Sequence, residues 1–404
     1  MPRLQIRPSG ADGPAADAAP QERSASSVDE RVTPLELFFD LVFVFAITQV
    51  TGLLSQHPSW SGLGHGVLVL AALWWAWAAY AWLTNTVNPE EGVARLVVFA
   101  AMGAMLIASL AVPGAFRGDA EVFALAYLAM RLLQVALYLL AARDDAPLRG
   151  ALRRLAPGLT LGPTILVVAS VVNPSLRDAL WLVALAIDWS SAFLSGTGGW
   201  RLSPGHFAER HGLIVIIALG ESVVAIGVGA SGLPIGARLV GEALLGLAVA
   251  GALWWVYFDV VALVAERRLR SLPFAQQVGM ARDSYTYLHF PIVAGIIIAA
   301  FGIKRGLAVQ SRDLGTIGAV ALLGGCALNL LGLVAFRLRN LGTLNRQRLV
   351  CAVVLLAAIP ALAHAPALVG IAVAAALTCG LVAYEALRFA GARQRVRGTA
   401  PAEG

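Results

Sequence analysis

Two acidic residues, Glu36 and Asp40, lie near the start of the first long apolar segment. Residues 35–54 contain thirteen Leu, Ile, Val and Phe side chains, enough for a helix that crosses a bilayer. Residues four apart lie one turn apart on one helix face, and an acidic residue in the hydrocarbon core costs about 2.5–3.5 kcal/mol on insertion scales. We interpret both acids as part of a substrate or ion pathway, and we expect Asp40, one turn deeper, to need a protein partner or water.

A polar stripe is predicted on the apolar segment at 120–142. Its members fall at positions i, i+4, i+7 and i+11, which share one face of a helix. The stripe consists of Tyr127, Arg131, Gln134 and Tyr138. We interpret Arg131 and Gln134 as candidates for the same pathway as the two acids.

Arg131 must have a partner if its segment crosses the membrane, because an arginine side chain does not lose its proton in proteins. We expect Asp40 or Glu36 to supply the counter-charge, with Asp188 and Glu221 as further candidates. The pattern is compatible with a structural ion pair and with a substrate or ion site, since ionisable groups inside a membrane are usually functional.

A third polar group begins the apolar segment that follows residue 205. His206, Glu209 and Arg210 lie at its start, and Glu221 returns to the same face three turns after Arg210. We interpret the first three as a gate or proton entry on the cytoplasmic side, or as a salt-bridge cluster at the membrane surface. We place Glu221 and Ser222 on the pathway. The spacing of histidine and glutamate matches no zinc-protease motif, so we expect no metal site.

Asp259 and His289 are secondary candidates. Asp259 follows an aromatic run, and His289 begins a His-Phe-Pro sequence. A lone histidine on an apolar helix is usually a packing residue, although histidine also titrates near neutral pH. The two residues could act as base and acid in a membrane-embedded lipid enzyme. No motif for a catalytic serine, a phosphate or a dinucleotide lies in a suitable loop, so we expect neither an enzyme nor a bound cofactor.

The composition predicts an all-α polytopic membrane protein. Of 404 residues, 58% are hydrophobic and 13% are charged, which is too apolar for a soluble domain. About twelve segments are long enough to cross the hydrocarbon core of a bilayer. They lie near 35–55, 63–83, 93–114, 120–142, 155–173, 177–196, 211–231, 239–263, 285–303, 315–336, 347–364 and 367–388.

The basic residues predict the orientation. With the N-terminus inside, the cytoplasmic loops and tails carry 23 basic residues and the outer loops carry 6. This asymmetry follows the positive-inside rule, so we expect an even number of spans, a disordered cytoplasmic tail at 1–30 and a basic cytoplasmic tail at 391–404. The net charge of +6 arises from these regions, which leaves no basis for nucleic-acid binding. The expected partners are the lipid bilayer and a small molecule or ion.

An internal repeat is suggested by two aromatic segments. Residues 72–83 and 252–263 both begin Ala-Leu-Trp-Trp and lie 180 positions apart. We interpret residues 31–200 and 201–390 as two six-helix halves with the same orientation in the membrane, which is a parallel repeat.

The repeat also predicts where the buried charges lie. An offset of 180 places Asp40 within one residue of Glu221, so these two acids are expected at equal depths. With Arg131 they would form a polar centre built from three helices.

The first apolar segment and the segment that follows residue 205 together resemble the bacterial low temperature requirement A (LtrA) family. The matching residues are Glu36-Leu-Phe-Phe-Asp40-Leu-Val-Phe-Val-Phe45 and His206-Phe-x-Glu209-Arg210-x-Gly212-Leu…Ala218-Leu-Gly220-Glu221-Ser222. Further matches are Thr84-Asn85, Trp255-x-Tyr257-Phe258 and Tyr287-x-His289-x-Pro291. The likeness extends from residue 31 to about 303. It implies a multi-pass protein of the bacterial inner membrane linked to growth at low temperature, and it implies no reaction, substrate or catalytic residue.

A second similarity concerns the first segment alone. Phe39-Asp40-x-Val42-Phe43…Ala46-Ile47-Thr48 is similar to the Phe-Ser-Asp motif in the first helix of a family of lysosomal and bacterial potassium channels, which also use six-helix repeats. Phe39 stands here in place of the serine.

The sequence is compatible with several functions. The leading hypothesis is a transporter or ion-conducting protein with a polar site between the two halves, because charge lies inside several spans and the short loops leave no room for a soluble domain. One alternative is a non-catalytic membrane factor for cold or stress adaptation, in which the charges only hold helices together. The others are a potassium-channel-like protein and a membrane-embedded lipid enzyme.

Overall fold

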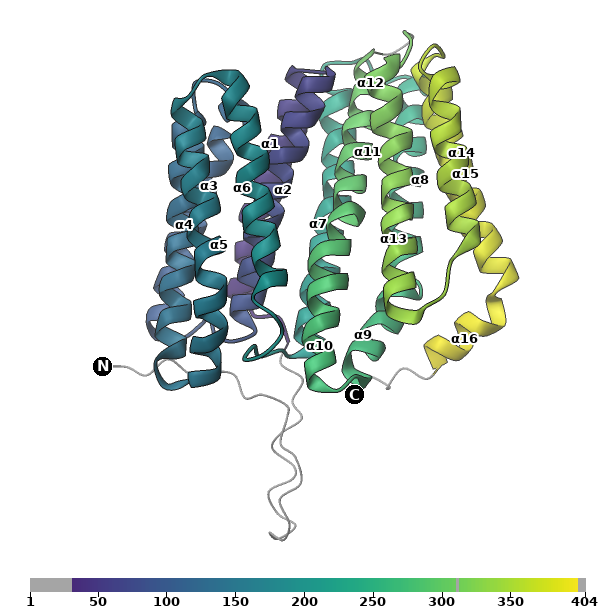
Figure 1. Cartoon of the computed structure of the whole chain (residues 1–404). Coiled ribbons are helices and arrows are strands. Elements are labelled where there is room, and N and C mark those ends of the chain that lie inside the picture. The colour runs from purple at the N-terminus through teal and green to yellow at the C-terminus, as the bar shows by residue number, and fades with distance from the viewer. Residues whose placement is uncertain (1–30, 310–311, 399–404) are drawn as a thin grey trace.

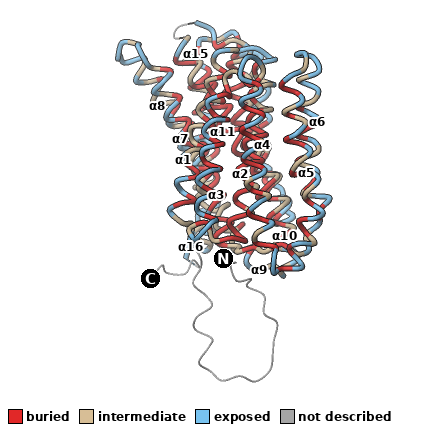
Figure 2. The backbone as a smooth tube through the Cα atoms, turned by 90° about the vertical axis from the view of Figure 1, so that its left-hand side faces the viewer, coloured by how far each residue is buried: buried red, intermediate tan, exposed pale blue. Residues whose placement is uncertain are grey.

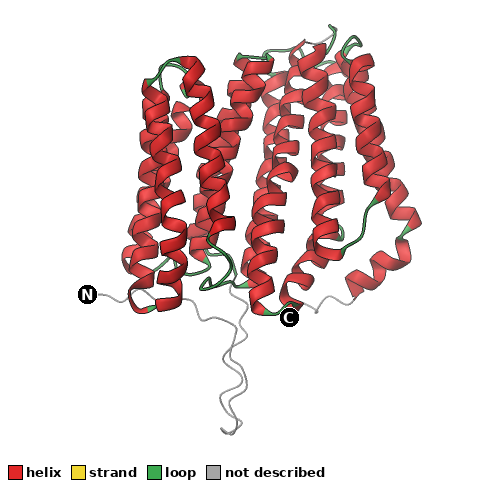
Figure 3. Cartoon of the chain, in the orientation of Figure 1, coloured by secondary structure: helices red, strands yellow, loops and turns green. Residues whose placement is uncertain are grey.

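The computed structural model describes residues 31–309 and 312–398, and within them the chain forms a bundle of long helices with no β-strand (Figures 1 and 3). The predicted tail at 1–30 and residues 399–404 lie outside the described residues. The helical elements are α1 Pro34–Gln56, α2 Trp60–Thr84, α3 Gly92–Ala111, η1 Val112–Gly114, α4 Ala120–Ala141, η2 Ala142–Asp144, α5 Ala146–Val171, α6 Pro174–Leu194, α7 Pro204–Ala230, α8 Ala237–Phe258, α9 Val261–Ser271, α10 Phe274–Met280, η3 Ala281–Leu288, α11 His289–Val309, α12 Gly315–Ala319, η4 Val320–Gly324, α13 Gly325–Leu341, α14 Arg346–Leu362, α15 Ala367–Arg388 and α16 Ala390–Gly398.

Ten helical segments of the described part are long and apolar enough to cross a membrane. Two predicted spans are not among them, because α6 carries the three charged residues Arg177, Asp178 and Asp188, and α14 is 17 residues long. Both nevertheless pack within the bundle, α6 against α5 and α14 against α13 and α15 (Figure 1). The predicted all-α polytopic membrane fold is therefore confirmed.

Apolar side chains cover much of the outer surface. Figure 2 shows buried and exposed residues alternating along the helices, with the buried ones concentrated inside the bundle. Large hydrophobic side chains such as Leu41, Leu96, Leu125 and Val350 are more than half exposed. A soluble protein rarely exposes this much apolar surface, whereas lipid tails solvate it.

The start of α1 is fixed by its own sequence. Pro34 lies in the first turn, where its missing N–H removes no helical hydrogen bond. The Thr33 hydroxyl accepts a hydrogen bond from the Glu36 N–H (3.3 Å), and Glu36 Oε2 accepts one from the Thr33 N–H (2.9 Å). This is a capping box. One of the two predicted pathway acids thus also has a structural role.

The first and seventh long helices, α1 and α7, pack against each other in the middle of the bundle (Figure 1). Both begin at the lower face in Figure 1, which is also where α16 ends. We call this the terminal face. The loops that precede α5 and α7 lie there as well (Figure 1), so these two basic loops share the face at which α16 ends.

The second helix, α2, connects the two predicted halves. The Trp74 indole N–H donates to the carbonyl oxygen of Thr286 (2.9 Å), and the Trp82 indole N–H donates to the Thr286 hydroxyl (2.8 Å). Thr286 lies in η3, a π-helix. Such turns are rare and often occur at functional sites, and this one presents both polar groups of Thr286 to α2.

The helices α11 and α13 pack backbone to backbone at two glycines. A Cβ added at Gly295 would lie 2.4 Å from the backbone N of Asn329, and one at Gly325 would lie 2.4 Å from the backbone N of Ala299. Small residues allow such close approach between membrane helices. The continuous rod α10–η3–α11 is therefore held closely against the rod α12–η4–α13.

Candidate functional site

The acids of α1 pair with basic residues of α7 near the terminal face. His206 Nε2 lies 3.0 Å from Glu36 Oε2, and Arg210 bridges Glu36 (3.1 Å) and Asp40 (2.8 Å). All four side chains are at most 3% exposed. We call Glu36, Asp40, His206 and Arg210 the charge cluster.

The charge cluster confirms that the deeper acid has protein partners. Besides Arg210, the Trp77 indole N–H donates to Asp40 Oδ1 (2.9 Å). Burying an ion pair costs free energy of desolvation, and close contacts and extra hydrogen bonds offset that cost. The cluster therefore joins α1, α2 and α7, and removal of one member would leave an uncompensated charge.

The contacts between α1 and α7 keep a constant register. Three of them join residues that are 170 positions apart. Two of these contacts lie in the charge cluster, and the third joins Thr51 to Glu221. A constant offset means that the two helices run in the same direction, as a parallel repeat requires.

The same register corrects the predicted depth of Glu221. It places Glu221 level with Thr51, about 16 Å beyond Asp40 at 1.5 Å of rise per residue. The prediction of equal depths is wrong, because the spatial pairing follows an offset of 170 and not the 180 of the aromatic segments.

Two threonines of α1 hold Glu221. The Thr48 hydroxyl donates to Oε2 (2.6 Å) and the Thr51 hydroxyl donates to Oε1 (2.5 Å). Glu221 is 1% exposed, and it forms no ion pair with any basic residue in the described part of the chain. Ser222 is equally buried beside it. We call Thr48, Thr51 and Glu221 the hydroxyl–carboxylate site.

Arg131 pairs with Asp188 of α6. Its Nη2 lies 2.7 Å from Asp188 Oδ1, and its Nη1 donates to Gln134 Oε1 (2.9 Å). The Tyr127 hydroxyl donates to the other Asp188 oxygen (3.3 Å). The predicted stripe is confirmed as a buried face of α4, which includes Tyr138.

The predicted polar centre of Asp40, Arg131 and Glu221 does not form. Asp40 takes Arg210 as its partner because α1 and α7 are adjacent and in register. The counter-charge of Arg131 is Asp188, which the sequence offered only as a further candidate. Within residues 31–309 and 312–398, no contact joins Arg131 to Asp40. Asp40, Arg131 and Glu221 thus belong to three separate groups of buried polar residues.

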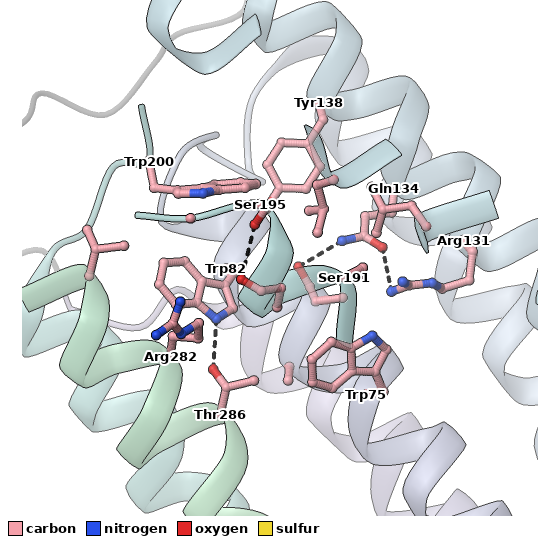
Figure 4. Close-up of a pocket in the computed structure, with 17 residues that line it drawn as sticks. Trp75, Trp82, Arg131, Gln134, Tyr138, Ser191, Ser195, Trp200, Arg282 and Thr286 are labelled. Carbon is pink, nitrogen blue, oxygen red and sulfur yellow. Dashed lines mark hydrogen bonds between the residues drawn. The ribbon is translucent and has the colours of Figure 1, made fainter. Parts of the chain in front are cut away.

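A pocket lies beside Arg131 (Figure 4). Its cavity volume is about 60 Å³, below the roughly 300–1,000 Å³ of drug-sized ligand sites. Its walls come from α2, α4, α5, α6, the loop before α7 and the α10–η3 segment. The aromatic side chains around it are Trp75, Trp82, Tyr138 and Trp200.

The charged side chains of the pocket are both positive. Arg131 is fully buried, and Arg282 is partly exposed. The neutral polar groups are Gln134, Ser191, Ser195 and Thr286. None of the described residues that line the pocket is acidic. Arg131 Nε has no hydrogen-bond partner among the residues that the structure describes, so a donor is left for a ligand.

The pocket lies between the two predicted halves. Most of its lining belongs to residues 31–200, while Val278, Arg282 and Thr286 come from the second half. Gly196 is an exposed part of the lining. The pocket therefore reaches the protein surface in the loop before α7, near the terminal face.

Glu209 does not belong to the charge cluster. It is exposed and accepts a hydrogen bond from the Val32 N–H (3.2 Å). Of the three residues predicted to form a gate, the structure brings together only His206 and Arg210, with the acids of α1.

Asp259 lies at the C-terminal end of α8 and binds α16. It forms an ion pair with Arg393 (2.6 Å) and contacts Arg397. Residues 391–398 of the predicted basic tail therefore lie in the helix α16, which is tied to the bundle.

His289 has hydrogen-bond partners on both ring nitrogens. Its Nδ1 lies 3.1 Å from the carbonyl oxygen of Ser284, which can only accept, so Nδ1 carries the proton. The Tyr257 hydroxyl then donates to Nε2 (2.9 Å). Asp259 and His289 each have other partners, so the geometry does not pair them as acid and base.

The sequence reasoning missed the tryptophans of the pocket wall and assigned no role to Thr48. Trp75 and Trp82 are seven residues apart on α2, which places them on one face, but α2 is apolar on all sides and the pattern gives no preference. Thr48 lies three residues before Thr51, a helical spacing that could have been combined with the acid stripe of α1.

Outside the spans, Asp145 joins the start of α5 to the loop before α7. Its carboxylate accepts a hydrogen bond from the Leu148 N–H (2.9 Å) and pairs with Arg201 (2.7 Å). Partial burial raises the pKa of Asp145, but these hydrogen bonds and the charge of Arg201 outweigh burial and hold the pKa below its ordinary value. The loop next to the pocket is thus fixed by an ionised side chain.

Comparison with known proteins extends the resemblance seen in the motifs. Residues 31–383 match the family described as bacterial low temperature requirement A protein (LtrA). A protein of Rhizobium meliloti (strain 1021), named only as uncharacterized, is 33% identical over 315 residues, which cover 74% of this chain and 75% of that protein. No solved structure matches the chain. The protein therefore belongs to the bacterial LtrA family and is a multi-pass membrane protein.

Proposed function

We propose that this protein is a transporter that carries a small organic anion across the bacterial inner membrane. The observation that supports this most strongly is the pocket between the two predicted halves, which contains a fully buried arginine and no acidic side chain among its described lining residues. A guanidinium group with a free N–H recognises a carboxylate. The aromatic walls suit the apolar body of an organic molecule.

Asp188 neutralises Arg131 without using all of its donors. Asp188 and Gln134 occupy the two terminal nitrogens of the guanidinium group, while Nε stays free among the described residues. Arg282 adds a second positive charge, and its partner Asp283 (2.8 Å) is not part of the lining. These charges favour a negative ligand over a neutral or positive one.

The transport proposal is tested with the purified protein in liposomes. Labelled benzoate and phenylacetate serve as aromatic anions, and choline serves as a cation. We expect saturable uptake of an anion and none of choline. Arg282→Gln should lower the uptake about tenfold, since a hydrogen bond to a charged group is worth about 1.5–3 kcal/mol.

Arg339→Gln is the matched control for this experiment. Arg282 and Arg339 both pair with Asp283 at 2.8 Å, but Arg339 does not line the pocket. Arg339→Gln should leave the uptake unchanged. Equal losses in the two variants, or no saturable uptake of either anion, would contradict the proposal.

The proposed orientation has the terminal face in the cytoplasm. The support is the asymmetry of 23 basic residues against 6. The pocket would then be reached from the cytoplasm. Epitope tags at both ends of the chain should resist a protease added outside spheroplasts and be digested after lysis. Digestion in intact spheroplasts would reverse the orientation.

A non-catalytic membrane factor for cold adaptation is the second candidate. The supporting observation is that the buried pairs join different helices, α4 to α6 and α1 to α7. If the charges serve only packing, Arg131→Met combined with Asp188→Leu should restore stability and growth at low temperature lost in either single variant. A transporter predicts that this double variant is stable but inactive.

A further inference from the structure

The hydroxyl–carboxylate site differs from the other buried acids. Asp40, Asp188 and Glu242 each lie within 3.0 Å of an arginine nitrogen. Glu221 has no such partner in the described part of the chain, and its oxygens accept hydrogen bonds only from Thr48 and Thr51. A carboxylate without a counter-charge is costly inside a membrane, so binding a proton is a favourable way to remove the charge.

The two threonines can satisfy Glu221 in either protonation state. The Thr48 hydroxyl also lies 3.2 Å from the Val44 carbonyl oxygen, and the Thr51 hydroxyl lies 3.0 Å from the Thr48 carbonyl oxygen. A hydroxyl has one proton to donate. When Glu221 is ionised, both hydroxyls donate to it. When it is protonated, its O–H donates to one threonine oxygen, and that threonine donates to its helix carbonyl instead.

The ionisable groups around Glu221 allow both states. The charge of Lys304 on α11 favours the ionised state of Glu221, and no ion-pair contact joins the two side chains in the described residues. The neighbouring helix α8 carries the buried Glu242 nearer the end of α7, and Glu242 is neutralised by Arg238 (3.0 Å). On α1, the facing residues are threonines, which do not titrate. Burial opposes a charge on Glu221, whereas the two threonine hydroxyls and the charge of Lys304 favour it, so each protonation state has support from the surroundings.

We propose that Glu221 is the proton-binding site that couples anion transport to the proton gradient. This inference rests on the transporter proposed above. A proton carried with a monovalent anion makes the movement electroneutral, so the membrane potential does not oppose it. A metal cation fits the site less well, because hard cations need about six or more oxygen ligands. Here two hydroxyls contact the carboxylate directly at 2.5 and 2.6 Å.

The first test detects the proton without any transported solute. The protein in lipid nanodiscs is titrated from acid to alkaline pH and followed by difference infrared spectroscopy. Because the chain has 24 acidic residues, the band of Glu221 is identified as the carboxylic acid carbonyl band that disappears on titration of the wild type and is missing from the spectrum of Glu221→Gln. Glu242→Gln, the same change in a buried but arginine-paired acid, should keep the band. A band that persists in Glu221→Gln would overturn the assignment.

A second variant keeps the test decisive if Glu221→Gln does not fold. Thr51→Val removes one donor to the ionised carboxylate. Because a hydrogen bond to a charged group favours the ionised state, its loss should move the pH at which the band disappears upward by about one unit. An unchanged titration would overturn the proposed role of the threonines and of the site.

The coupling is tested separately by flux. An imposed proton gradient should drive accumulation of the anion by the wild type. Glu221→Gln should abolish this accumulation but keep exchange of labelled for unlabelled anion at equal pH. Accumulation that persists in Glu221→Gln would reject the coupling. A proton band at Glu221 with no anion flux in any variant would reject the transporter and retain the proton site.

Discussion

Both ends of the α1–α7 interface bury acidic side chains, but only one end supplies basic partners for them. Near the terminal face, the acids of α1 are paired with Arg210 and His206. About 16 Å further along, the acid is on α7, and α1 offers only hydroxyl groups. Helix direction and register are common to both ends, so the difference is one of charge compensation. A compensated acid fixes the helices, whereas an uncompensated acid can change its protonation state.

The largest expected loss in the free energy of unfolding is at the charge cluster, where the acids have basic partners. Arg210→Met leaves Glu36 and Asp40 without their shared arginine, and breaking a buried ion pair from one side costs about 3–5 kcal/mol. Denaturant unfolding in detergent micelles should show this loss. Asp40→Leu added to Arg210→Met should recover part of it. A loss below about 1 kcal/mol in Arg210→Met would mean that the charge cluster does not stabilise the interface.

A double-mutant cycle separates the charge cluster from the pair on α4 and α6. Arg131→Met and Asp188→Leu should show an interaction free energy of about 1–3 kcal/mol, because the two side chains are in contact. Arg131→Met and Asp40→Leu should be additive within about 0.5 kcal/mol. Coupling of Arg131 to Asp40 as strong as to Asp188 would restore the three-helix centre predicted from the sequence.

Loss of the charge at the hydroxyl–carboxylate site should change the stability of the protein little. Glu221→Gln keeps the shape of the side chain and can still hydrogen-bond to Thr48 and Thr51. We expect a change in the free energy of unfolding within about 1 kcal/mol, measured beside Arg210→Met under the same conditions. A loss as large as that of Arg210→Met would show that both ends are structural.

The smallest change in the free energy of unfolding is expected at the partly exposed pair of Asp145 and Arg201 outside the membrane. The folded-state pKa of Asp145 is lowered, so its ionised form stabilises the protein above the ordinary pKa of about 3.9. That stability is lost as pH falls through the folded-state pKa. Asp145→Asn should destabilise the protein by at most about 1 kcal/mol at neutral pH and by nothing in strong acid. Unfolding of both proteins across this pH range checks the sign.

Helices and helix faces could be predicted from the sequence because they depend on local spacing. The stripe of Arg131 and Gln134 is buried as expected, and the stripe that begins at Glu36 and Asp40 continues to Thr51. These patterns follow from the length of the apolar segments and from the 3.6-residue period of the α-helix.

The partners of the buried charges could not be predicted in the same way. Whether Arg131 meets Asp40 or Asp188 depends on which helices are neighbours, and sequence spacing within one helix does not contain that information. The aromatic repeat suggested an offset of 180, but the side chains of α1 and α7 meet at 170. The pocket escaped prediction for the same reason, since its walls come from six parts of the chain.

The glycine contacts between α11 and α13 have a mechanical consequence. Where the two rods touch through their backbones at Gly295 and Gly325, no side chain lies between them that could repack. Arg282 and Thr286 belong to the same continuous rod as α11. These two residues of the pocket therefore belong to a closely packed helix pair, and opening of the pocket requires movement of its other walls, which are α2, α4, α5, α6 and the loop before α7, against that pair.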